Sequence, residues 1–354
     1  MTSHSDAEPA DLCALGESEP AAVRVLHVLP GRPEGHNMVF AREMAARLRL
    51  HGVDVVEFFV ESRSSPRQLW HDFHALRASI ASHRIVVVHA QYGAVTGLLA
   101  ALAAGRHKFV LNVRGSDLNR VPSENLLRNQ LARLMTRAAA IRSDAVVCVS
   151  AALQRQLWCV GRKSVVIPSG VDMALFHPME QAVARQALGW RSDERVVLFN
   201  AGLAPTQKGQ PLVERAITRL GELGLACRLE IVRGERSRHD MMLLLNAADC
   251  AVLASESEGS PNIVKEAMAC NLPVVSVRVG DVQERMQCVR PVAIVDRSEH
   301  SLATGMHDVL TVGGRSNGKE VLERQGLSLD ASSAKLCALY RSVVANDEFA
   351  LNRR

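Results

Sequence analysis

The chain lacks several features that would assign it to a simple class of protein. Only 4% of its 354 residues are aromatic, so the stacking surfaces that bind single-stranded nucleic acid would have few side chains. Its eight cysteines form no CxxC pair and no tight metal-ligand spacing, which favours buried, reduced thiols over a metal site. No segment offers about 18 uninterrupted apolar residues, so no membrane-spanning helix is predicted.

The N-terminus also lacks the basic start and apolar run of a signal peptide. Residues 1–20 are polar and acidic, and we expect a loose tail there and a cytoplasmic protein. The net charge of +5 allows a polyanionic or membrane-surface partner. Because Lys and Arg are dispersed through the chain, the net charge alone does not distinguish a polyanionic partner from a membrane surface. We expect no nucleic-acid partner.

What the chain does have is a regular alternation of apolar strand patterns with amphipathic helical ones. Strands are predicted in "VRVLHVLP", "VDVVEFFV", "RIVVVHA", "KFVLNV", "DAVVCVS" and "SVVIP", and then in "RVVLFNA", "CRLEIVR", "CAVLAS", "LPVVSV" and "PVAIV". Continuous Val/Ile-rich strands between helices indicate parallel sheets covered on both faces. The fold class is therefore α/β, with two doubly wound, Rossmann-like domains.

The two series of strands are separated by "IPSGVDMALFHPMEQ", whose prolines and glycine suit an interdomain connection. We place the first domain at residues 21–178 and the second at 179–327. Ligands in such folds bind beyond the carboxyl ends of the strands, so the loops after the strands are the place to look for a site.

One of these loops, "SESEGSPNIVKEAMAC", carries two glutamates eight positions apart, Glu258 and Glu266. Ser260 is a good N-cap residue and Pro261 suits the first helical position, so the helix is predicted to begin at Pro261. Its free N–H groups would favour an anion in the loop. The glutamates could be a general acid and base, or acceptors for hydroxyl groups. Complementing the helix dipole explains Glu258 but explains Glu266 poorly, because that effect fades beyond the first turn.

Two further candidate loops each follow the first predicted strand of a domain. In "FNAGLAPTQKGQ", Lys208 stands where it could neutralise a diphosphate opposite the glutamate loop, although a solvated lysine explains it when it is taken alone. In "PGRPEGHN", Gly31 and Gly35 permit close backbone approach by a ligand, and an ordinary turn explains them as well. Their spacing does not fit the G-x-G-x-x-G fingerprint, which argues against an NAD-dependent oxidoreductase.

These segments together resemble glycosyltransferase family 4. "EGSPNIVKEAMACNLPVVSVRVGD" resembles the E-x7-E donor motif of that family, and "CVSAALQRQL…VVIPSGVDMALFHP" resembles its linker. "IVVVHAQYG", "NVRGSDLNR", "LLLNAADCAVLAS" and "LCALYRSVV" follow in the family's order. The resemblance covers residues 23–344.

The resemblance implies a GT-B fold, two Rossmann-like domains facing a cleft, with the segment 328–354 packing back on the first domain. Glu266 would accept hydrogen bonds from the donor's ribose, Glu258 would lie by the donor sugar, and Lys208 would hold the diphosphate. It implies retaining transfer from a nucleotide sugar, with no cofactor and no metal. The remaining donor-side residues would be Gly202, Gly259, Ser260, Pro261, Asn262 and Ile263, with Gly31 and Gly35 in the loop on the acceptor and phosphate side.

The sequence departs from the family pattern at two positions that matter. Leu203 stands where an arginine often follows glycine, and Arg114 stands where many members carry a histidine. Because an arginine stays protonated, it cannot be a base. We expect Arg114 to supply the positive charge that is missing at position 203, from the opposite side of the cleft.

A last feature concerns the acceptor. The helical segment "LLRNQLARLMTRAAAIR" sets four arginines among leucines, which suits either a solvated surface helix or contact with an anionic membrane at the cytoplasmic face. The acceptor is then a saccharide or a lipid-linked saccharide, and the enzyme serves surface polysaccharide or glycolipid assembly. The alternative is a catalytically silent protein that keeps the fold to bind sugar nucleotides or to act as a scaffold.

Overall fold

The structure, a computed structural model, describes residues 23–34, 38–234 and 236–345. The predicted tail at residues 1–20 and the candidate residue Gly35 lie outside these ranges. In the part of the chain that is described, no helix is both long and apolar enough to cross a membrane.

The first sheet has six parallel strands in the order β2-β1-β3-β4-β5-β6. The Val- and Ile-rich runs form its buried interior, as such runs do in a sheet covered on both faces. The strands are β1 (Arg24–Pro30), β2 (Asp54–Val60), β3 (Val87–Ala90), β4 (Lys108–Val113), β5 (Ala145–Cys148) and β6 (Ser164–Val166).

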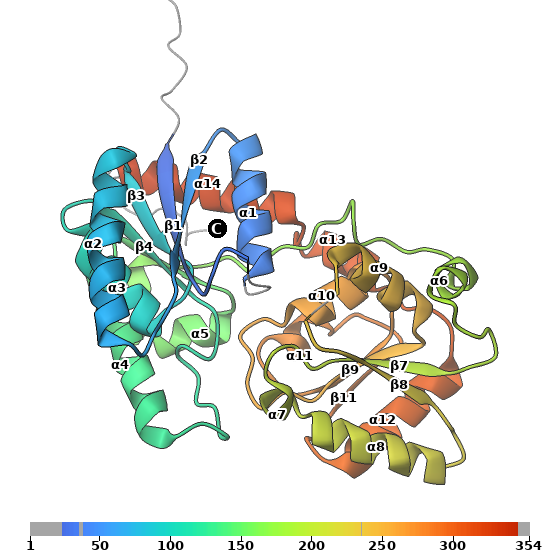
Figure 1. Cartoon of the computed structure of the whole chain (residues 1–354). Helices are drawn as coiled ribbons and strands as arrows, with labels where there is room; N and C mark the ends of the chain where they lie inside the picture. The colour runs from blue at the N-terminus through green and yellow to red at the C-terminus, as the bar shows by residue number, and fades with distance from the viewer. Residues whose placement is uncertain (1–22, 35–37, 235, 346–354) are drawn as a thin grey trace, which may run out of the picture.

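Helices cover both faces of this sheet (Figure 1). They are α1 (Val39–Leu50), α2 (Pro66–Ser82), α3 (Ala94–Ala104), α4 (Leu126–Arg142), α5 (Ala151–Gln156) and the 3-10 helix η1 (Trp158–Lys163). The chain runs from β1 outward to β2 and then returns to β3 on the other side of β1. This reversal makes a topological switch point, and the crevice beyond it is where such folds bind ligands.

The second sheet has five parallel strands in the order β11-β10-β9-β7-β8. They are β7 (Val196–Asn200), β8 (Arg228–Val232), β9 (Cys250–Leu253), β10 (Val274–Val277) and β11 (Val292–Val295). The accompanying helices are α6 (Gln181–Leu188), α7 (Pro205–Lys208), α8 (Gln210–Glu222), α9 (Arg238–Ala247), α10 (Asn262–Ala269), α11 (Val282–Arg285), α12 (Glu299–Val312) and α13 (Gly318–Arg324). The switch point here lies between β7 and β9, beside the glutamate loop.

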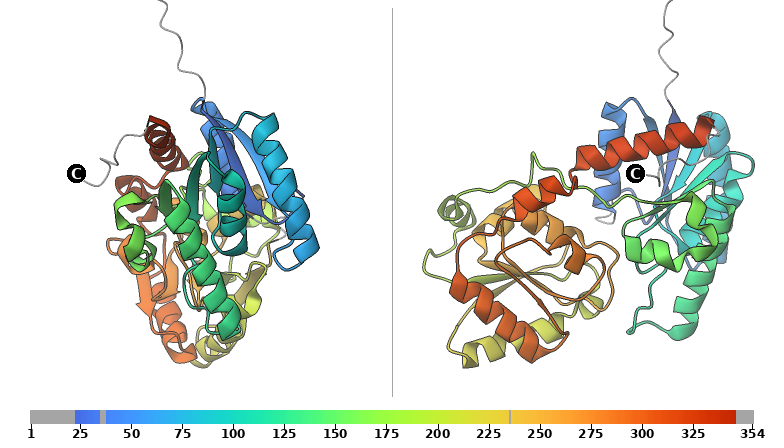
Figure 2. Two further views of the ribbon diagram at one scale, coloured as in Figure 1. Left: turned by 90° about the vertical axis from the view of Figure 1, so that its left-hand side faces the viewer. Right: turned by 180° about the vertical axis from the view of Figure 1, so that it is seen from behind.

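The last helix, α14 (Leu329–Ala345), returns to the first domain and lies beside α1, as the view from behind in Figure 2 shows. Val171 pairs with Ser328 where the chain crosses back. The phenol of Tyr340 on α14 is buried between two histidines of the first sheet, with its oxygen 3.0 Å from His27 Nε2 and 2.5 Å from His89 Nδ1. Burial lowers the pKa of His27 to about 3, so these rings are neutral and the contact is a hydrogen-bond network.

Two doubly wound parallel-sheet domains that face a cleft are thus confirmed. Each predicted strand is present within a few residues of its expected ends. The loop after β4 in one domain meets the segments that follow β7 and β9 in the other, and the candidate site lies between them.

Candidate active site

Two adjoining cavities lie between the domains, with volumes of about 220 Å³ and 190 Å³. Arg114, Lys208 and Glu258 line both of them. The larger is also lined by Phe40, Val149, Ser169 and Asn200 and by the start of α10, residues 260–263. The three charged residues predicted to do the chemistry are therefore brought together from loops far apart in the sequence.

Glycines let the domains touch beside these cavities. A Cβ on Gly259 would lie 1.9 Å from the carbonyl oxygen of Arg114, far inside van der Waals contact. Across the contact, Gly115 has a φ of +148°, and a Cβ there would lie 2.8 Å from the Gly259 nitrogen. Asn119 of the first domain also donates to the Glu258 carbonyl at 2.9 Å. The glutamate loop is thus held directly against the loop that carries Arg114.

Glu258 and Lys208 form an ion pair with each other. Ser255 Oγ also donates to Glu258 Oε1, at 2.8 Å. Lys208 ends the short helix α7, and the next residue, Gly209, packs so tightly on the residue that follows β9 that a Cβ would lie 2.4 Å from the Ala254 carbonyl oxygen. That packing fixes the lysine opposite the glutamate. In this state each charge neutralises the other, so an incoming anion must compete with Glu258 for Lys208.

Arg114 is held by neutral groups. Its guanidinium donates to the Gln91 carbonyl at 2.7 Å, to Gln91 Oε1 at 2.6 Å and to Ser169 Oγ at 3.0 Å, and it lies 4.3 Å over the ring of Phe40. Among the described residues no carboxylate oxygen lies within 4.0 Å of its guanidinium nitrogens, so the side chain forms no ion pair. Burial lowers the pKa of Arg114 to about 9, which still leaves it protonated at neutral pH.

The loop that carries Arg114 is shaped by Asp117. The Asp117 carboxylate accepts from the backbone N–H groups of Gly93, Arg114 and Gly115 at 2.8–3.1 Å. Burial raises the pKa of Asp117, and these hydrogen bonds oppose the rise. An aspartate four residues beyond the end of a strand is a signal for such a turn, and our interpretation of the sequence did not use it.

The start of α10 differs from the prediction. The helix begins at Asn262 with Pro261 as its N-cap, and no side chain caps it, so the prediction that Ser260 caps a helix beginning at Pro261 is wrong. Pro261 has a helical φ of −68° but an extended ψ of 122°, which places it just outside the helix. Ser260 Oγ and Asn262 Oδ1 are buried without a hydrogen-bond partner in the described chain. Uncapped N–H groups and two unsatisfied polar atoms therefore border the larger cavity.

Glu266 lies one turn further along α10 and is buried. Its Oε1 accepts from Arg238 Nη1 at 2.7 Å. The same guanidinium donates to both carboxylate oxygens of Glu43, on α1 of the other domain, at 2.6 and 3.1 Å, and it stacks 4.5 Å over the ring of Phe176. Sequence reasoning missed Arg238 and Glu43, which make Glu266 part of a bridge between the domains.

Lys265, also on α10, was missed as well. It is buried, and its Nζ donates to the Ser169 carbonyl at 2.6 Å. Burial lowers the pKa of Lys265 to about 8. Because Arg114 donates to the hydroxyl of the same serine, cations from both domains meet at Ser169 in the connecting segment.

The comparisons with known proteins agree with this arrangement. The model of Glycosyltransferase Family 4 matches residues 14–175, and the model of Glycosyl transferases group 1 matches residues 155–311. The chain belongs to glycosyltransferase family 4. Its GT-B fold follows from the two facing sheets described above, and the resemblance read from the motifs is confirmed.

Two curated relatives of this family 4 chain show what similar proteins do. It is 31% identical over 170 residues to a D-inositol 3-phosphate glycosyltransferase of Mycobacterium marinum, a match that covers 41% of this chain and 34% of the relative. It is 28% identical over 235 residues to TuaC of Bacillus subtilis, named as a putative teichuronic acid biosynthesis glycosyltransferase, covering 61% and 59%. The chain thus spans from about a third to three fifths of the length of these relatives.

Solved structures with this fold extend over almost the whole family 4 chain. Sucrose-phosphate synthase from Thermosynechococcus elongatus has a TM-score of 0.73 at 18% identity, covering 92% of this chain and 100% of the other. The Anabaena protein HepE, solved in complex with UDP and glucose, has a TM-score of 0.68 at 18% identity, covering 90% and 100%. At this identity the likeness concerns the fold alone.

The other predicted residues are placed less centrally. Gly259 lines the smaller cavity, while Ser260, Pro261, Asn262 and Ile263 line the larger. Gly202 has a positive φ of 52° and packs near Lys208, and Gly31 makes a turn whose N–H donates to the Val60 carbonyl at 3.0 Å. Neither Gly202 nor Gly31 lines the two cavities.

Proposed function

We propose that this chain is a retaining glycosyltransferase that moves a sugar from a nucleoside-diphosphate sugar, held by the second domain, to a saccharide or lipid-linked acceptor at the first. The observation that carries the proposal is the convergence of Arg114, Lys208 and Glu258 on cavities bordered by the uncapped start of α10. Such a helix start, with unpaired N–H groups and nearby cations, suits a diphosphate. Family membership and the UDP complex of HepE support the same donor class.

In the proposed reaction the bond between the anomeric carbon and the diphosphate oxygen breaks. The acceptor oxygen bonds to the same face of that carbon, and its proton passes to the departing diphosphate. The cations Lys208 and Arg114 stabilise the charge that grows on the diphosphate, which lowers the barrier only to the extent that they bind the transition state better than the donor. Because those side chains carry fixed positive charge, we propose that no metal ion is needed.

In this proposal, donor binding breaks the Lys208–Glu258 ion pair and leaves the Arg238–Glu266 pair in place. The diphosphate takes Lys208 from Glu258, and the freed Glu258 carboxylate then accepts from a hydroxyl of the sugar. The ribose hydroxyls donate to Glu266, whose Oε2 carries no hydrogen bond in the described chain while its Oε1 is bound by Arg238.

A product assay tests the transfer. The chain is incubated with a nucleoside-diphosphate sugar and candidate acceptors in chelator, and released nucleoside diphosphate and product are followed by NMR. The proposal expects a product with the anomeric configuration of the donor and turnover that chelation does not reduce. Inverted configuration would refute retention, and a requirement for added metal would refute the metal-free reaction.

One observation favours a second candidate, a catalytically silent protein that keeps the fold to bind sugar nucleotides. Glu266, predicted to bind ribose, is engaged by Arg238 and does not line either cavity. Nucleotide binding without any turnover, including slow hydrolysis of the donor, would select this candidate. Turnover that is lost in Lys208→Ala would exclude it.

We further propose that α4 brings the acceptor domain to an anionic membrane at the cytoplasmic face. Leu127, Leu131, Leu134 and Ile141 are each at least half exposed and fall on one face of the helix, opposite its buried residues. The helix η1, which carries the exposed Trp158, contacts α4. Arginines on both sides of the stripe, Arg128, Arg133, Arg137 and Arg142, supply the charge that complements acidic lipid.

Vesicle co-sedimentation tests the membrane contact. Wild type is expected to pellet with vesicles of phosphatidylcholine and phosphatidylglycerol at low salt, and much less with phosphatidylcholine alone. Leu127→Ser with Leu131→Ser should abolish pelleting, while Leu50→Ser, at an exposed leucine on α1, should not. Absence of pelleting with the acidic vesicles would refute this part of the proposal.

A further inference from the structure

A cavity of about 470 Å³ lies away from the cleft, in the second domain. It is lined by residues that precede strands: Arg195 before β7, Asp249 before β9 and Asn271 before β10. Because all strands of this sheet are parallel, the cavity is at the edge opposite the carboxyl ends that face the cleft. The proposed donor site and this cavity therefore share no residue.

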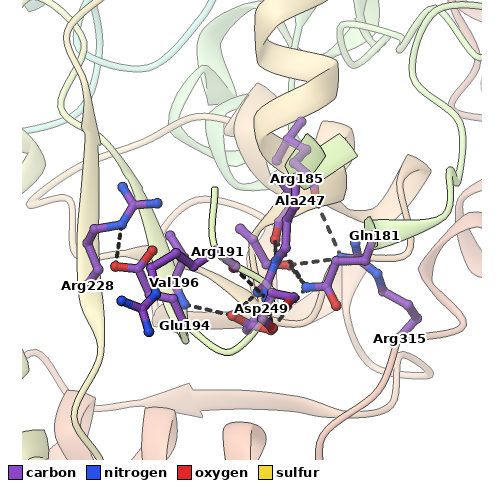
Figure 3. A network of polar contacts seen from close by, with 12 residues as sticks. Gln181, Arg185, Arg191, Glu194, Val196, Arg228, Ala247, Asp249 and Arg315 are labelled. Carbon is purple, nitrogen blue, oxygen red and sulfur yellow. Dashed lines mark hydrogen bonds and ion pairs between the residues drawn. The ribbon is translucent and has the colours of Figure 1, made fainter. Parts of the chain in front are cut away.

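The Asp249 carboxylate at this cavity is already engaged by hydrogen bonds and an ion pair (Figure 3). The Asp249 carboxylate accepts from Arg185 Nη2 at 2.8 Å, from the Val196 N–H at 2.7 Å and from Gln181 Nε2 at 3.0 Å. Asp249 thus has its charge balanced by Arg185, and the exposed Glu180 at the rim is the other acid that lines the cavity.

Two further arginines line the cavity and have no such partner. Neither Arg195 nor Arg315 has a carboxylate within 4.0 Å among the described residues. Arg315 Nη1 donates to the Leu245 and Ala248 carbonyls at 3.4 and 3.2 Å, and its Nη2 is buried without a hydrogen-bond partner in the described chain. Burial lowers the pKa of Arg315, because these neutral contacts do not make up for the lost water. Arg315 thus lines the cavity with a guanidinium that has no ion-pair partner among the described residues.

The remaining lining suits a small organic molecule. Val309 and Leu310 bring apolar surface, and the backbone of Gly313–Gly314 is exposed. The volume falls in the range of small-molecule sites, which runs from roughly 300 to 1,000 Å³. A lining that combines positive charge with aliphatic carbon matches a ligand that carries one anionic group on a short carbon skeleton.

We propose that this cavity is a second ligand site, separate from the cleft, for a phosphorylated small molecule whose phosphate is held by Arg195 and Arg315. Both guanidinium groups can donate to phosphate oxygens, which are the acceptors that arginine binds best. The Pro178–Gln181 segment at its rim ends the connection between the domains, so an occupant contacts the segment on which α6 is anchored.

Calorimetric titration with glycerol 3-phosphate tests the site, with inorganic phosphate and glycerol as the two partial probes. Two backgrounds separate this site from the cleft: Lys208→Ala weakens phosphate binding in the cleft, and Arg315→Met weakens it in the cavity. We expect glycerol 3-phosphate to bind Lys208→Ala as it binds wild type. In Arg315→Met and in the milder Arg195→Gln, its Kd should rise by about tenfold or more, the loss typical of a hydrogen bond to a charged group.

Controls keep the result decisive. Arg106→Gln, at an exposed arginine of the first domain, should leave the Kd unchanged, and glycerol should not bind. Nucleoside-diphosphate binding to Arg315→Met should stay at the wild-type level, which shows that the variant is folded and that the cleft is intact. Binding that disappears in Lys208→Ala but survives in both Arg315→Met and Arg195→Gln would overturn the proposal, since all phosphate would then bind in the cleft. If inorganic phosphate binds with the same Kd as glycerol 3-phosphate, the carbon skeleton contributes nothing to binding, and that part of the proposal is wrong.

Discussion

Replacement of Arg238 by methionine tests the bridge between the domains. In the wild type one guanidinium serves two carboxylates, Glu43 and Glu266, whose side chains are 22% and 7% exposed. Burial raises the pKa of Glu43 in spite of Arg238, whereas the two carboxylates raise the pKa of Arg238 in spite of burial. The network thus stabilises the charged form of Arg238, whereas burial disfavours the charged form of Glu43.

The magnitude follows from what Arg238→Met leaves behind. Loss of one partner from a buried ion pair costs about 3–5 kcal/mol, because a buried charge is left uncompensated. Since Arg238 is itself 29% exposed, water can screen part of the loss, and the lower end of about 3 kcal/mol is expected. In a chain of this size about 2 °C of Tm accompanies each kcal/mol, so the Tm should fall by roughly 6 °C near neutral pH.

The pH dependence gives the sharper test. Without Arg238 the pKa of the buried Glu43 carboxylate in the folded protein rises further above its unfolded value, because Arg238 no longer opposes the effect of burial, so the folded form binds more protons than the unfolded form. Stability then falls as the pH rises past the unfolded value of 4.5 and is restored below it. Thermal unfolding of variant and wild type should therefore differ more at about pH 7.5 than at about pH 5.

Glu43→Gln is the matched control for this prediction. It removes one of the two carboxylates and keeps the pair of Arg238 with Glu266. Its Tm should therefore change much less than that of Arg238→Met, and with little dependence on pH. Equal losses for Arg238→Met at the two pH values would contradict the charge argument, and a wild-type Tm would show that the bridge does not join the domains in solution.

Three further predictions concern the cleft and its support. Gly259→Ala should lower kcat/KM about 100-fold, because its Cβ would force the glutamate loop off the Arg114 carbonyl. Gly221→Ala is the control and should leave kcat/KM unchanged, since a Cβ there meets no atom within 4 Å. Equal activities of the two variants would refute the close contact. Arg114→Lys should lower kcat/KM by roughly 10- to 100-fold, because lysine keeps the charge but loses the paired bonds to Gln91, and unchanged kinetics would remove Arg114 from the mechanism. Tyr340→Phe should cost about 1–3 kcal/mol in chemical denaturation, because the buried His27 Nε2 loses its partner and His89 Nδ1 keeps only the Gln91 amide. A stability equal to wild type would show that this network does not anchor α14.

The strands were predictable from the sequence because each is a short buried run of Val, Ile and Leu between helical patterns. Such runs are recognised from neighbouring residues alone, without knowing which strands pair in the sheet. The start of α10 was not predictable in the same way, because a proline with a φ near −65° fits both the first helical position and the position before it. Its ψ, which places Pro261 outside the helix, is set by the contact of this loop with the first domain.

The site residues could also be predicted only where local sequence identifies them. Glu258, Lys208 and Arg114 could be named from loops that follow strands, and the structure brings them together. The pairing of Glu258 with Lys208 could not be predicted, since the two residues are 50 positions apart and nothing local favours the contact. The pairing of Arg238 with Glu43 spans 195 positions and two domains. Such contacts are set by how the two sheets face each other, which periodicity does not encode.

The most direct test of the proposed function is donor binding. Thermal shifts would be measured with UDP, GDP, ADP, CDP, dTDP and NAD, on the wild type and on Glu266→Ala. A ligand at about 100 times its Kd adds roughly 2.7 kcal/mol, which is a shift of a few degrees in a chain of this length. The account predicts a shift with one nucleoside diphosphate that is lost in Glu266→Ala. A shift with NAD alone, or no shift with any nucleoside diphosphate, would contradict it.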